Sequence, residues 1–304
     1  MIKSPLSNSK VNLIHKYKTN FIIAEYKKQL DINVGYLFKG IREISLYKDL
    51  KTGYEFYYPP VVGDSRFYQE LGKQPWYYMD WKWEYDMALK FIPRSGKVLE
   101  IGCGNAAFLK KIRRKSLNLV GLELNKNVFN KFYEQGISVL NSSIENYSKE
   151  HSDEFDMVCS FQVVEHIANI GEVIASLVKT LKEGGTLIVS VPNNNSLIFK
   201  ENDNIILNFP PHHQGKWTLN SLIKLTKLFP LEIDSVFFEP LQNYHDGYIY
   251  DYLLSKIDKN SNLAQRMILQ KQIKKVINSN IVNIREYLPG HTLMVIYKKT
   301  NQFK

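Results

Sequence analysis

Cysteine and long apolar runs are scarce in this 304-residue sequence. Its two cysteines, Cys103 and Cys159, are not placed like a disulfide pair, so we expect a reducing, cytoplasmic setting. No window approaches the roughly 18 apolar residues of a membrane-spanning helix. Residues 1–10 also lack the apolar core of a signal peptide. The sequence therefore predicts no membrane span and no secretory leader.

Acidic residues are fewer than basic ones. The sequence has 30 Asp and Glu and 40 Lys and Arg, which gives a formal net charge of +10. Such an excess favours anionic partners, among them nucleic acid. The lysines are scattered, however. The densest basic run, residues 109–115, follows a glycine-rich loop, where a helix would have a solvated face. We therefore do not expect a nucleic-acid partner.

The chain divides into two regions of different pattern. Residues 1–72 alternate short apolar runs with turn signals, which predicts a small β-rich region of strands and loops. Residues 73–304 follow, and Gln74 and Pro75 are predicted to open a helix there. From Lys97 onward, strands and helices alternate. Repeated βα units rich in Val, Ile and Leu predict an α/β fold, with a parallel sheet covered by helices on both faces.

Two further strands are predicted near the end of the chain, at residues 231–241 and 291–299. Between them, apolar residues recur at helical spacing in a helical insert at about residues 244–288. Its apolar face would pack against the domain or against a sister subunit, which allows a homodimer. A helix lying on a membrane surface fits less well, because the polar face is rich in Gln and Asn.

The most informative motif is VLEIGCGN, residues Val98–Asn105. Gly102, Cys103 and Gly104 follow a predicted buried strand and precede a predicted helix. Glycines at such a turn let the backbone approach a ligand closely, near the electropositive start of the helix. Taken alone, the GxGxxA pattern that ends at Ala107 also fits a nicotinamide dehydrogenase.

Two carboxylates flank this motif. Glu123 lies nineteen residues after Gly104, at the predicted end of the second strand, where it could accept both hydroxyls of a ribose. Glu100 lies before the glycines, where a carboxylate can hold an ammonium group directly or through water. A dinucleotide has no ammonium, and its pyrophosphate would be repelled. Glu100 therefore favours a cofactor that carries an amino acid.

Three further pieces follow in order along the chain. Residues 142–145 end the third predicted strand with small polar groups that can bond an adenine amine. Residues 155–167 form the fourth strand and its loop, and residues 182–189 form a tight turn into the fifth. An ordered set of this kind is much more specific than any one piece.

Residues 97 to about 193 thus resemble the core of class I S-adenosylmethionine-dependent methyltransferases. The resemblance implies a Rossmann-like fold with a seven-stranded, mostly parallel sheet whose last pair of strands is an antiparallel hairpin. It also implies S-adenosyl-L-methionine as the cofactor. The residues that it places at the cofactor are Glu100, Gly102, Cys103, Gly104, Glu123, Leu124, Ser143, Ile144, Phe161 and Gln162.

The preceding segments, residues 46–64 and 67–85, are similar to bacterial methyltransferases that carry an N-terminal zinc ribbon. Many of those act on sugars or in glycan and secondary-metabolite pathways. A Cys-x-x-Cys-Gly pair precedes the aromatic run in that family, whereas Asp49 and Thr52 stand at those places here. Tetrathiolate zinc needs the missing thiolates. We therefore predict a relic ribbon-like fold without metal in residues 1–72.

Aromatic residues are candidates for the acceptor side of the site. A dry aromatic cavity favours loss of charge from sulfur during methyl transfer, and Trp76, Tyr77, Tyr78 and Trp81 could form its lid. Core packing along an amphipathic helix explains each of them equally well. Trp217 would either stack on a sugar face or anchor the helix that follows.

Three histidines are candidates for removing a proton from a hydroxyl acceptor: His166, His212 and His213. His166 alternatively shapes the loop in which it lies. Adjacent histidines can bind metal, but no further ligands cluster near them in the sequence. Gln162 replaces the first carboxylate of the Glu-x-x-Glu-His metal site of some quinone-type O-methyltransferases, so catalytic Mg²⁺ is not expected. We predict no metal.

The leading hypothesis is a methyltransferase that methylates an oxygen of a sugar, glycan or secondary-metabolite intermediate. An RNA or protein methyltransferase is the alternative that the net charge favours. No Asn-Pro-Pro-Tyr or Asp-Pro-Pro-Tyr follows the fourth predicted strand, which argues against methylation of a base amine. A catalytically inactive module that binds S-adenosylmethionine, and a nicotinamide dehydrogenase, also stay open.

Overall fold

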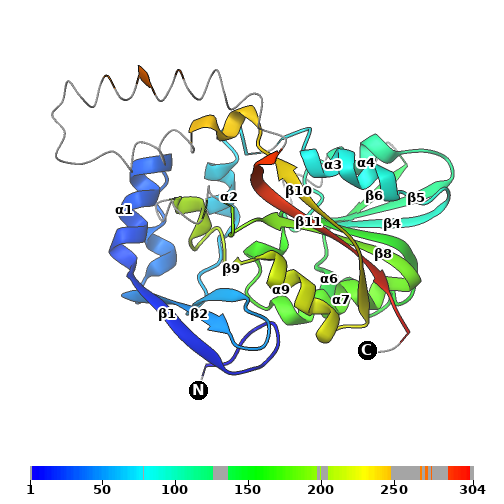
Figure 1. Ribbon diagram of the computed structural model, residues 1–304, viewed down its shortest axis with the longest axis horizontal. Coiled ribbons are helices and arrows are strands. Elements are labelled where there is room, and N and C mark those ends of the chain that lie inside the picture. The colour runs from blue at the N-terminus through cyan, green and yellow to red at the C-terminus, as the bar shows by residue number, and fades with distance from the viewer. Residues whose placement is uncertain are drawn as a thin grey trace.

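The computed structural model describes residues 2–77, 79–125, 136–196, 199, 205–247, 268, 271–272, 275 and 287–301. The strands of this part of the chain form one large and one small β-sheet (Figure 1). No helix within the described residues is long and apolar enough to cross a bilayer.

The large sheet has seven strands in the order β10-β11-β8-β7-β4-β5-β6. Five of them, from β8 to β6 in that order, run parallel, whereas β11 is antiparallel to both β8 and β10. The strands are β4 (Gly96–Ile101), β5 (Leu117–Leu122), β6 (Ile137–Leu140), β7 (Phe155–Phe161), β8 (Leu181–Pro192), β10 (Leu231–Pro240) and β11 (Pro289–Lys299). The predicted seven-stranded sheet with a terminal antiparallel hairpin is confirmed.

Helices cover both faces of this sheet. Figure 1 shows α3 and α4 on one side and α6, α7 and α9 on the other. Strand β4 is buried on both faces of the sheet, because Val98 packs with α3 and α4 while Leu99 and Ile101 pack with α7. The helices are α3 (Trp83–Ala88), α4 (Ala107–Ile112), α6 (Ile144–Tyr147), α7 (Ile170–Thr180) and α9 (Leu219–Ile223). Strands buried on both faces explain the continuous apolar runs of the sequence.

The small sheet has the strand order β1-β2-β3-β9, and all its pairs are antiparallel. Its strands are β1 (Val11–Lys18), β2 (Glu43–Asp49), β3 (Glu55–Tyr58) and β9 (Gly215–Lys216). In the register of β3 and β9, Glu55 lies opposite Lys216 and Phe56 opposite Gly215. The two regions predicted on either side of residue 72 are therefore joined by strand pairing.

Two helices of the first region were not predicted: α1 (Thr19–Leu30) and α2 (Ser65–Leu71). In α1 only Thr19, Ile22 and Tyr26 are buried, at helical spacing, although the local run Phe-Ile-Ile resembles a strand. Short 3₁₀ turns complete the described secondary structure. They are η1 (Gly35–Phe38), η2 (Leu89–Phe91), η3 (Val164–His166), η4 (Ile206–Asn208), η5 (Lys224–Lys227) and η6 (Asn243–His245).

A hydrogen-bonded carboxylate lies at the position where the predicted resemblance to zinc ribbons would place the first cysteine. The Asp49 side chain is 1% exposed and accepts the backbone N–H of Lys51 at 2.7 Å. Four hydroxyl groups also donate to it, from Ser4 at 2.8 Å, Ser7 at 2.6 Å, Ser9 at 2.5 Å and Thr52 at 2.7 Å. This hub ties the N-terminal segment to the β2–β3 turn with donors instead of metal ligands. The ribbon ancestry of the region stays a prediction.

The helix predicted to open at Gln74 and Pro75 was placed too early. Helix α3 begins at Trp83 and continues into η2, while residues 74–77 form turns. Tyr85 and Ala88 are the apolar residues of this stretch that α3 buries against the sheet. Burial of an apolar face stabilises a short helix more than local propensity does. Residues 126–135 lie outside the described residues, as does most of the helical insert predicted at about residues 244–288.

Candidate active site

A cavity of about 1900 Å³ opens beyond the carboxyl ends of β4, β5 and β7. Ligands of open α/β sheets bind in this crevice, because loops diverge there from the strand ends. The cavity is larger than the roughly 300–1,000 Å³ of an ordinary ligand pocket. It therefore has room for a cofactor and a second molecule.

The glycine loop forms one wall of this cavity. Gly102 has φ +60° and Gly104 has φ +50°, which non-glycine residues rarely adopt. A β-carbon at Gly102 would lie 2.5 Å from Val163 Cγ2. A β-carbon at Gly104 would meet no atom within 4 Å. The backbone at Gly104 is therefore open to close approach by a ligand, as the motif predicts.

Glu123 lies at the end of β5 and is fixed by this loop. Its Oε2 accepts the Gly104 N–H at 2.9 Å, and its Oε1 accepts the Asn125 N–H at 2.7 Å. Each carboxylate oxygen keeps a further lone pair for a ligand hydroxyl. The next residue, Leu124, also lines the cavity and is 67% exposed.

Glu100 is buried in β4, with 2% of its surface exposed. Its Oε2 has no hydrogen-bond partner among the residues that the structure describes. Burial raises the pKa of this carboxyl to about 8, against the lowering effect of the charge on Lys82. Glu100 does not itself line the cavity, but its charge raises the pKa values of Tyr85 and Cys103, which do line it. A buried carboxylate without a donor is uncommon, and it fits a cationic ligand close by.

The remaining predicted cofactor residues lie around the same cavity. Ser143 caps α6, and its hydroxyl accepts the backbone N–H of Asn146 at 3.3 Å. Phe161 packs edge-on against Phe108, with ring centroids 4.9 Å apart. Apart from Glu100, all of the predicted cofactor residues line the cavity: Gly102, Cys103, Gly104, Glu123, Leu124, Ser143, Ile144, Phe161 and Gln162.

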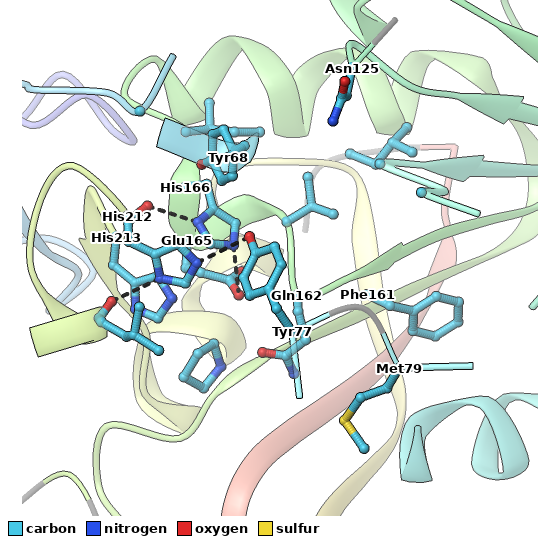
Figure 2. A pocket seen from close by; sticks show the side chains of 18 of the residues that line it. Tyr68, Tyr77, Met79, Asn125, Phe161, Gln162, Glu165, His166, His212 and His213 are labelled. Carbon is cyan, nitrogen blue, oxygen red and sulfur yellow. Dashed lines mark hydrogen bonds and ion pairs between the residues drawn. The ribbon is translucent and has the colours of Figure 1, made fainter. Parts of the chain in front are cut away.

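Three histidines gather in another part of this cavity (Figure 2). His166 belongs to η3, whereas His212 and His213 follow η4. One side-chain nitrogen of each lies within 4.8 Å of the others. The His166 ring centroid is 4.5 Å from that of His212 and 5.0 Å from that of His213. The fold thus brings together all three residues predicted to act on the acceptor.

Burial keeps these histidines neutral. It lowers the pKa of His166 to about 4, and it lowers the pKa values of His212 and His213 well below the ordinary range, with a further contribution from the neighbouring imidazoles. As neutral groups they can accept a proton, but their low pKa makes each of them a weak base.

Polar groups from other elements surround the cluster. The Glu165 side chain is 1% exposed, with Oε1 3.6 Å from His166 Nε2, and burial raises the pKa of its carboxyl to about 8. The Tyr77 hydroxyl lies 3.3 Å from His212 Nε2. The Tyr68 ring stands edge-on to His166, with centroids 6.3 Å apart. Tyr77 therefore lines the cavity beside the histidines, and its role toward an acceptor stays a prediction.

The other aromatic candidates fare differently. Trp76 lines the cavity and is 46% exposed, whereas Trp81 does not line it and donates its Nε1–H to Asp86 at 2.6 Å. Tyr78 lies outside the described residues. Trp217 is fully buried against Tyr54, with ring centroids 4.4 Å apart, and lies away from the cavity. The interpretation of Trp217 as a sugar platform is therefore wrong, and it acts as an anchor.

A second polar cluster was missed by sequence reasoning. Glu239 at the end of β10, His245 in η6 and His291 in β11 hold side-chain ligand atoms within 4.8 Å of one another. His245 and His291 also line the cavity. Glu239 and His245 are close in the chain, but His291 is far from both, and the pairing of β10 with β11 brings it to them.

Comparison with known proteins agrees with this geometry. A family model described as a methyltransferase domain matches residues 78–235. The chain is similar to the mitochondrial ubiquinone biosynthesis O-methyltransferase of Dictyostelium discoideum, with 31% identity over 129 residues, 36% of this chain and 39% of that protein. It is also similar to the ubiquinone biosynthesis O-methyltransferase of Proteus mirabilis, with 26% identity over 43% of this chain and 57% of that protein. The chain thus spans about half the length of these curated relatives.

Among solved structures, a SAM-dependent methyltransferase from Archaeoglobus fulgidus aligns with a TM-score of 0.51 and 21% identity. The alignment covers 76% of this chain and 100% of that one. At this identity the likeness establishes the fold of the chain.

Proposed function

The chain belongs to the family of methyltransferase domains, and on this premise we propose that it transfers a methyl group from S-adenosyl-L-methionine to a hydroxyl oxygen of a small-molecule acceptor. The observation that supports this most is one cavity lined both by the glycine loop with Glu123 and by His166, His212 and His213. Cofactor and acceptor can therefore lie side by side in it.

The residues of the cofactor wall fit S-adenosylmethionine. Glu100 Oε2 is buried without a partner among the described residues, which suits an ammonium group nearby. Gly104 leaves open space beside Glu123, where a ribose could lie close to the backbone and donate its hydroxyls to the Glu123 carboxylate. When bound, this cofactor supplies a methyl group on a positively charged sulfur that departs as a neutral thioether.

The chain's own contribution is alignment and exclusion of water. Phe161, Tyr68 and Tyr77 line the cavity, and aromatic walls of this kind keep a reaction site dry. Holding the reacting groups in line can supply several kcal/mol, because effective molarities of about 10⁵ M or more are reached. The neutral histidines receive the proton that the acceptor hydroxyl gives up.

An oxygen acceptor suits this site, because a hydroxyl must lose a proton to become an effective nucleophile and the histidines are the groups beside it. The names of the curated relatives point to O-methylation as well. The acceptor class that we propose is a sugar, glycan or secondary-metabolite intermediate. Hydroxylated compounds of ubiquinone biosynthesis are worth testing beside it. RNA and protein acceptors are the alternative.

The test is a methyl-transfer assay on the purified chain with radiolabelled S-adenosylmethionine. Catechols, sugar nucleotides, RNA and protein extracts are offered in parallel, and mass spectrometry locates the new methyl group. We expect an O-methylated small molecule and no label in RNA or protein. Label in a macromolecule would favour the alternative. Tight cofactor binding with no acceptor turned over would favour an inactive binding module, and binding of NAD instead would overturn the proposal.

A further inference from the structure

We infer that His166, His212 and His213 form a binding site for a divalent transition-metal ion of the Zn²⁺ class. The metal site itself follows from the positions of protons on the three rings. Its role, holding the acceptor oxygen, rests on the proposed function and deepens it.

Two of the rings expose a lone pair because their other nitrogen is tied to a backbone carbonyl. His166 Nδ1 lies 2.8 Å from the carbonyl oxygen of His212, and His212 Nδ1 lies 3.0 Å from that of Leu207. A carbonyl oxygen only accepts hydrogen bonds, so each Nδ1 carries the proton. The neutral ring then presents Nε2 as an unprotonated ligand atom.

The third ring is fixed in the same way by an amide. His213 Nδ1 lies 3.3 Å from Asn208 Oδ1. The amide nitrogen of Asn208 donates to Asn194 Oδ1 at 2.9 Å, which leaves the oxygen to face His213. His213 Nδ1 is therefore also a donor, and its Nε2 is also unprotonated.

This pattern is what metal-binding histidines show, because such a ring almost always donates its other N–H to an oxygen that fixes the tautomer. One nitrogen of each ring lies within 4.8 Å of the others. Nitrogen ligands at about 2.0 Å from zinc in a tetrahedron are about 3.3 Å apart. Small movements of the three side chains toward one another would therefore bring one nitrogen of each to this spacing.

The surroundings are rich in acceptor atoms. Glu165 Oε1 lies 3.6 Å from His166 Nε2, and Glu165 Oε2 has no partner among the described residues. A carboxyl oxygen and an imidazole lone pair this close to each other need a proton or a cation between them. Figure 2 shows Glu165 and Tyr77 beside the three rings, where the Tyr77 hydroxyl can donate to His212 Nε2. A cation would relieve this concentration of lone pairs.

The cluster of Glu239, His245 and His291 does not meet the same requirement. The backbone N–H of Gln242 donates to His245 Nδ1 at 2.9 Å, so the proton of neutral His245 is on Nε2. That Nε2 faces His291 Nδ1 at 2.5 Å and Glu239 Oε2 at 3.9 Å. A protonated nitrogen donates a hydrogen bond and cannot ligate a metal. This cluster is a hydrogen-bonded chain and supplies a matched control.

The ligand set selects the metal. Neutral imidazoles suit Zn²⁺ and Co²⁺, whereas Mg²⁺ and Ca²⁺ require oxygen ligands. Three protein ligands leave a fourth position, which can face the cavity shared with the cofactor. An ion there would draw in the oxygen of an acceptor and lower the pKa of its hydroxyl. Because the ring nitrogens would then be occupied, the proton would leave to Glu165 or to solvent and not to the histidines.

The experiment titrates the chelator-treated full chain with Zn²⁺ by calorimetry and with Co²⁺ by visible absorption. We expect one ion per chain and the intense bands of tetrahedral Co²⁺. His213→Gln should weaken Zn²⁺ binding at least 100-fold, and Asn208→Ala about tenfold. The control His291→Gln should bind as the unaltered chain does. Absence of micromolar binding, or equal loss in His291→Gln, would overturn the site.

Two measurements keep the result independent of folding and of the proposed function. X-ray absorption at the zinc edge of the unaltered chain should show three nitrogen neighbours at about 2.0 Å, and a shell of oxygen alone would contradict the site. Calorimetry with S-adenosylmethionine on the metal-free chain tests the cofactor separately. Failure of that binding would count against the proposed function, whereas failure of zinc binding would count against this inference.

Discussion

Two glutamates near the ends of neighbouring strands of the large sheet differ in the hydrogen bonds that they accept. Glu123 is held by two backbone N–H groups, at 2.9 and 2.7 Å. Glu100 is 2% exposed, and its Oε2 has no donor among the described residues. A buried group in this state costs free energy until a ligand supplies the missing partner. At the scale of single residues, we therefore expect a cationic cofactor to stabilise Glu100 by supplying this missing partner.

The substitution Glu100→Gln keeps the shape of this side chain and removes the carboxyl group that can ionise beside an ammonium group. We expect the affinity for S-adenosylmethionine to fall at least tenfold, because the ammonium group loses a charged partner. Calorimetric titration measures the change. Glu232→Gln, the same substitution at an exposed position of β10, is the control and should leave the affinity unaltered. Equal affinities in all three proteins would remove Glu100 from the cofactor site.

The turn between β4 and α4 shows two glycines with different constraints. Both have positive φ, but only Gly102 faces a neighbouring side chain, Val163. We expect Gly102→Ala to lower the unfolding temperature by several degrees, because the β-carbon would lie 2.5 Å from Val163 Cγ2.

Gly104→Ala separates cofactor binding from stability. It should cost only the roughly 1–2 kcal/mol of a left-handed alanine, since its β-carbon meets no atom within 4 Å. The added methyl group projects into open space at the cavity, so affinity for S-adenosylmethionine should fall at least tenfold. Thermal unfolding and calorimetry on the two variants test both expectations. A Gly104→Ala protein that binds the cofactor normally would show that no ligand approaches this backbone.

The β2–β3 turn depends on the Asp49 hub. Burial by itself would raise the pKa of Asp49, but the hydrogen bonds from Ser7, Ser9, Thr52 and Ser4 outweigh burial and lower the pKa to about 2. A carboxyl with a lowered folded pKa stabilises the fold above its unfolded value near 3.9. That stability is lost as the pH falls from about 4 to about 2.

Asp49→Asn should therefore lower the free energy of unfolding at pH 7 by roughly 2 kcal/mol. The difference between variant and unaltered chain should shrink as the pH falls below about 4. Urea unfolding at pH 7, 4 and 3 measures it. Asp234→Asn, on the exposed side of β10, should change stability by less than about 0.5 kcal/mol. A difference for Asp49→Asn that does not change with pH would contradict the role of the charge.

At the scale of the whole molecule, the N-terminal region holds the loop that carries the histidines. The Tyr26 hydroxyl of α1 donates to the carbonyl of Phe209 at 2.9 Å and lies 3.4 Å from the donating N–H of His212. The Tyr57 hydroxyl donates to the carbonyl of Asn208 at 3.1 Å. The N-terminal region therefore holds the part of the cavity that carries the histidines, while the large sheet holds the wall formed by the glycine loop.

We expect the two sheets to unfold together, because buried residues of both belong to one core cluster and the pairing of β3 with β9 joins residues 1–72 to the second region. Calorimetry should give one unfolding transition. Tyr26→Phe should move this single transition to lower temperature without splitting it, because the free energy of unfolding falls by about 1–2 kcal/mol. Tyr58→Phe, in which an exposed tyrosine is changed, should leave the transition in place. Two separate transitions would show that residues 1–72 fold as a unit of their own.

Much of the large sheet could be predicted from the sequence alone. The alternation of strands and helices, the glycine turn at Gly102 and Gly104, and the carboxylates Glu100 and Glu123 all depend on residues close together in the chain. Backbone sterics and the burial of both sheet faces act over a few residues, so they leave a readable local pattern. The cofactor wall could be predicted for this reason.

The tertiary structure decided what depends on distant contacts. Trp217 is an anchor because Tyr54 covers it, and α3 starts at Trp83 because burial against the sheet begins there. His166 and His212 are 46 positions apart, and no spacing in the sequence indicates that their rings meet. The tautomer of each ring, on which the metal site depends, is set by oxygen atoms that only the folded chain brings to it. Local pattern thus determined the glycine loop and its two carboxylates, whereas long-range packing determined which side chains lie on the other wall of the cavity.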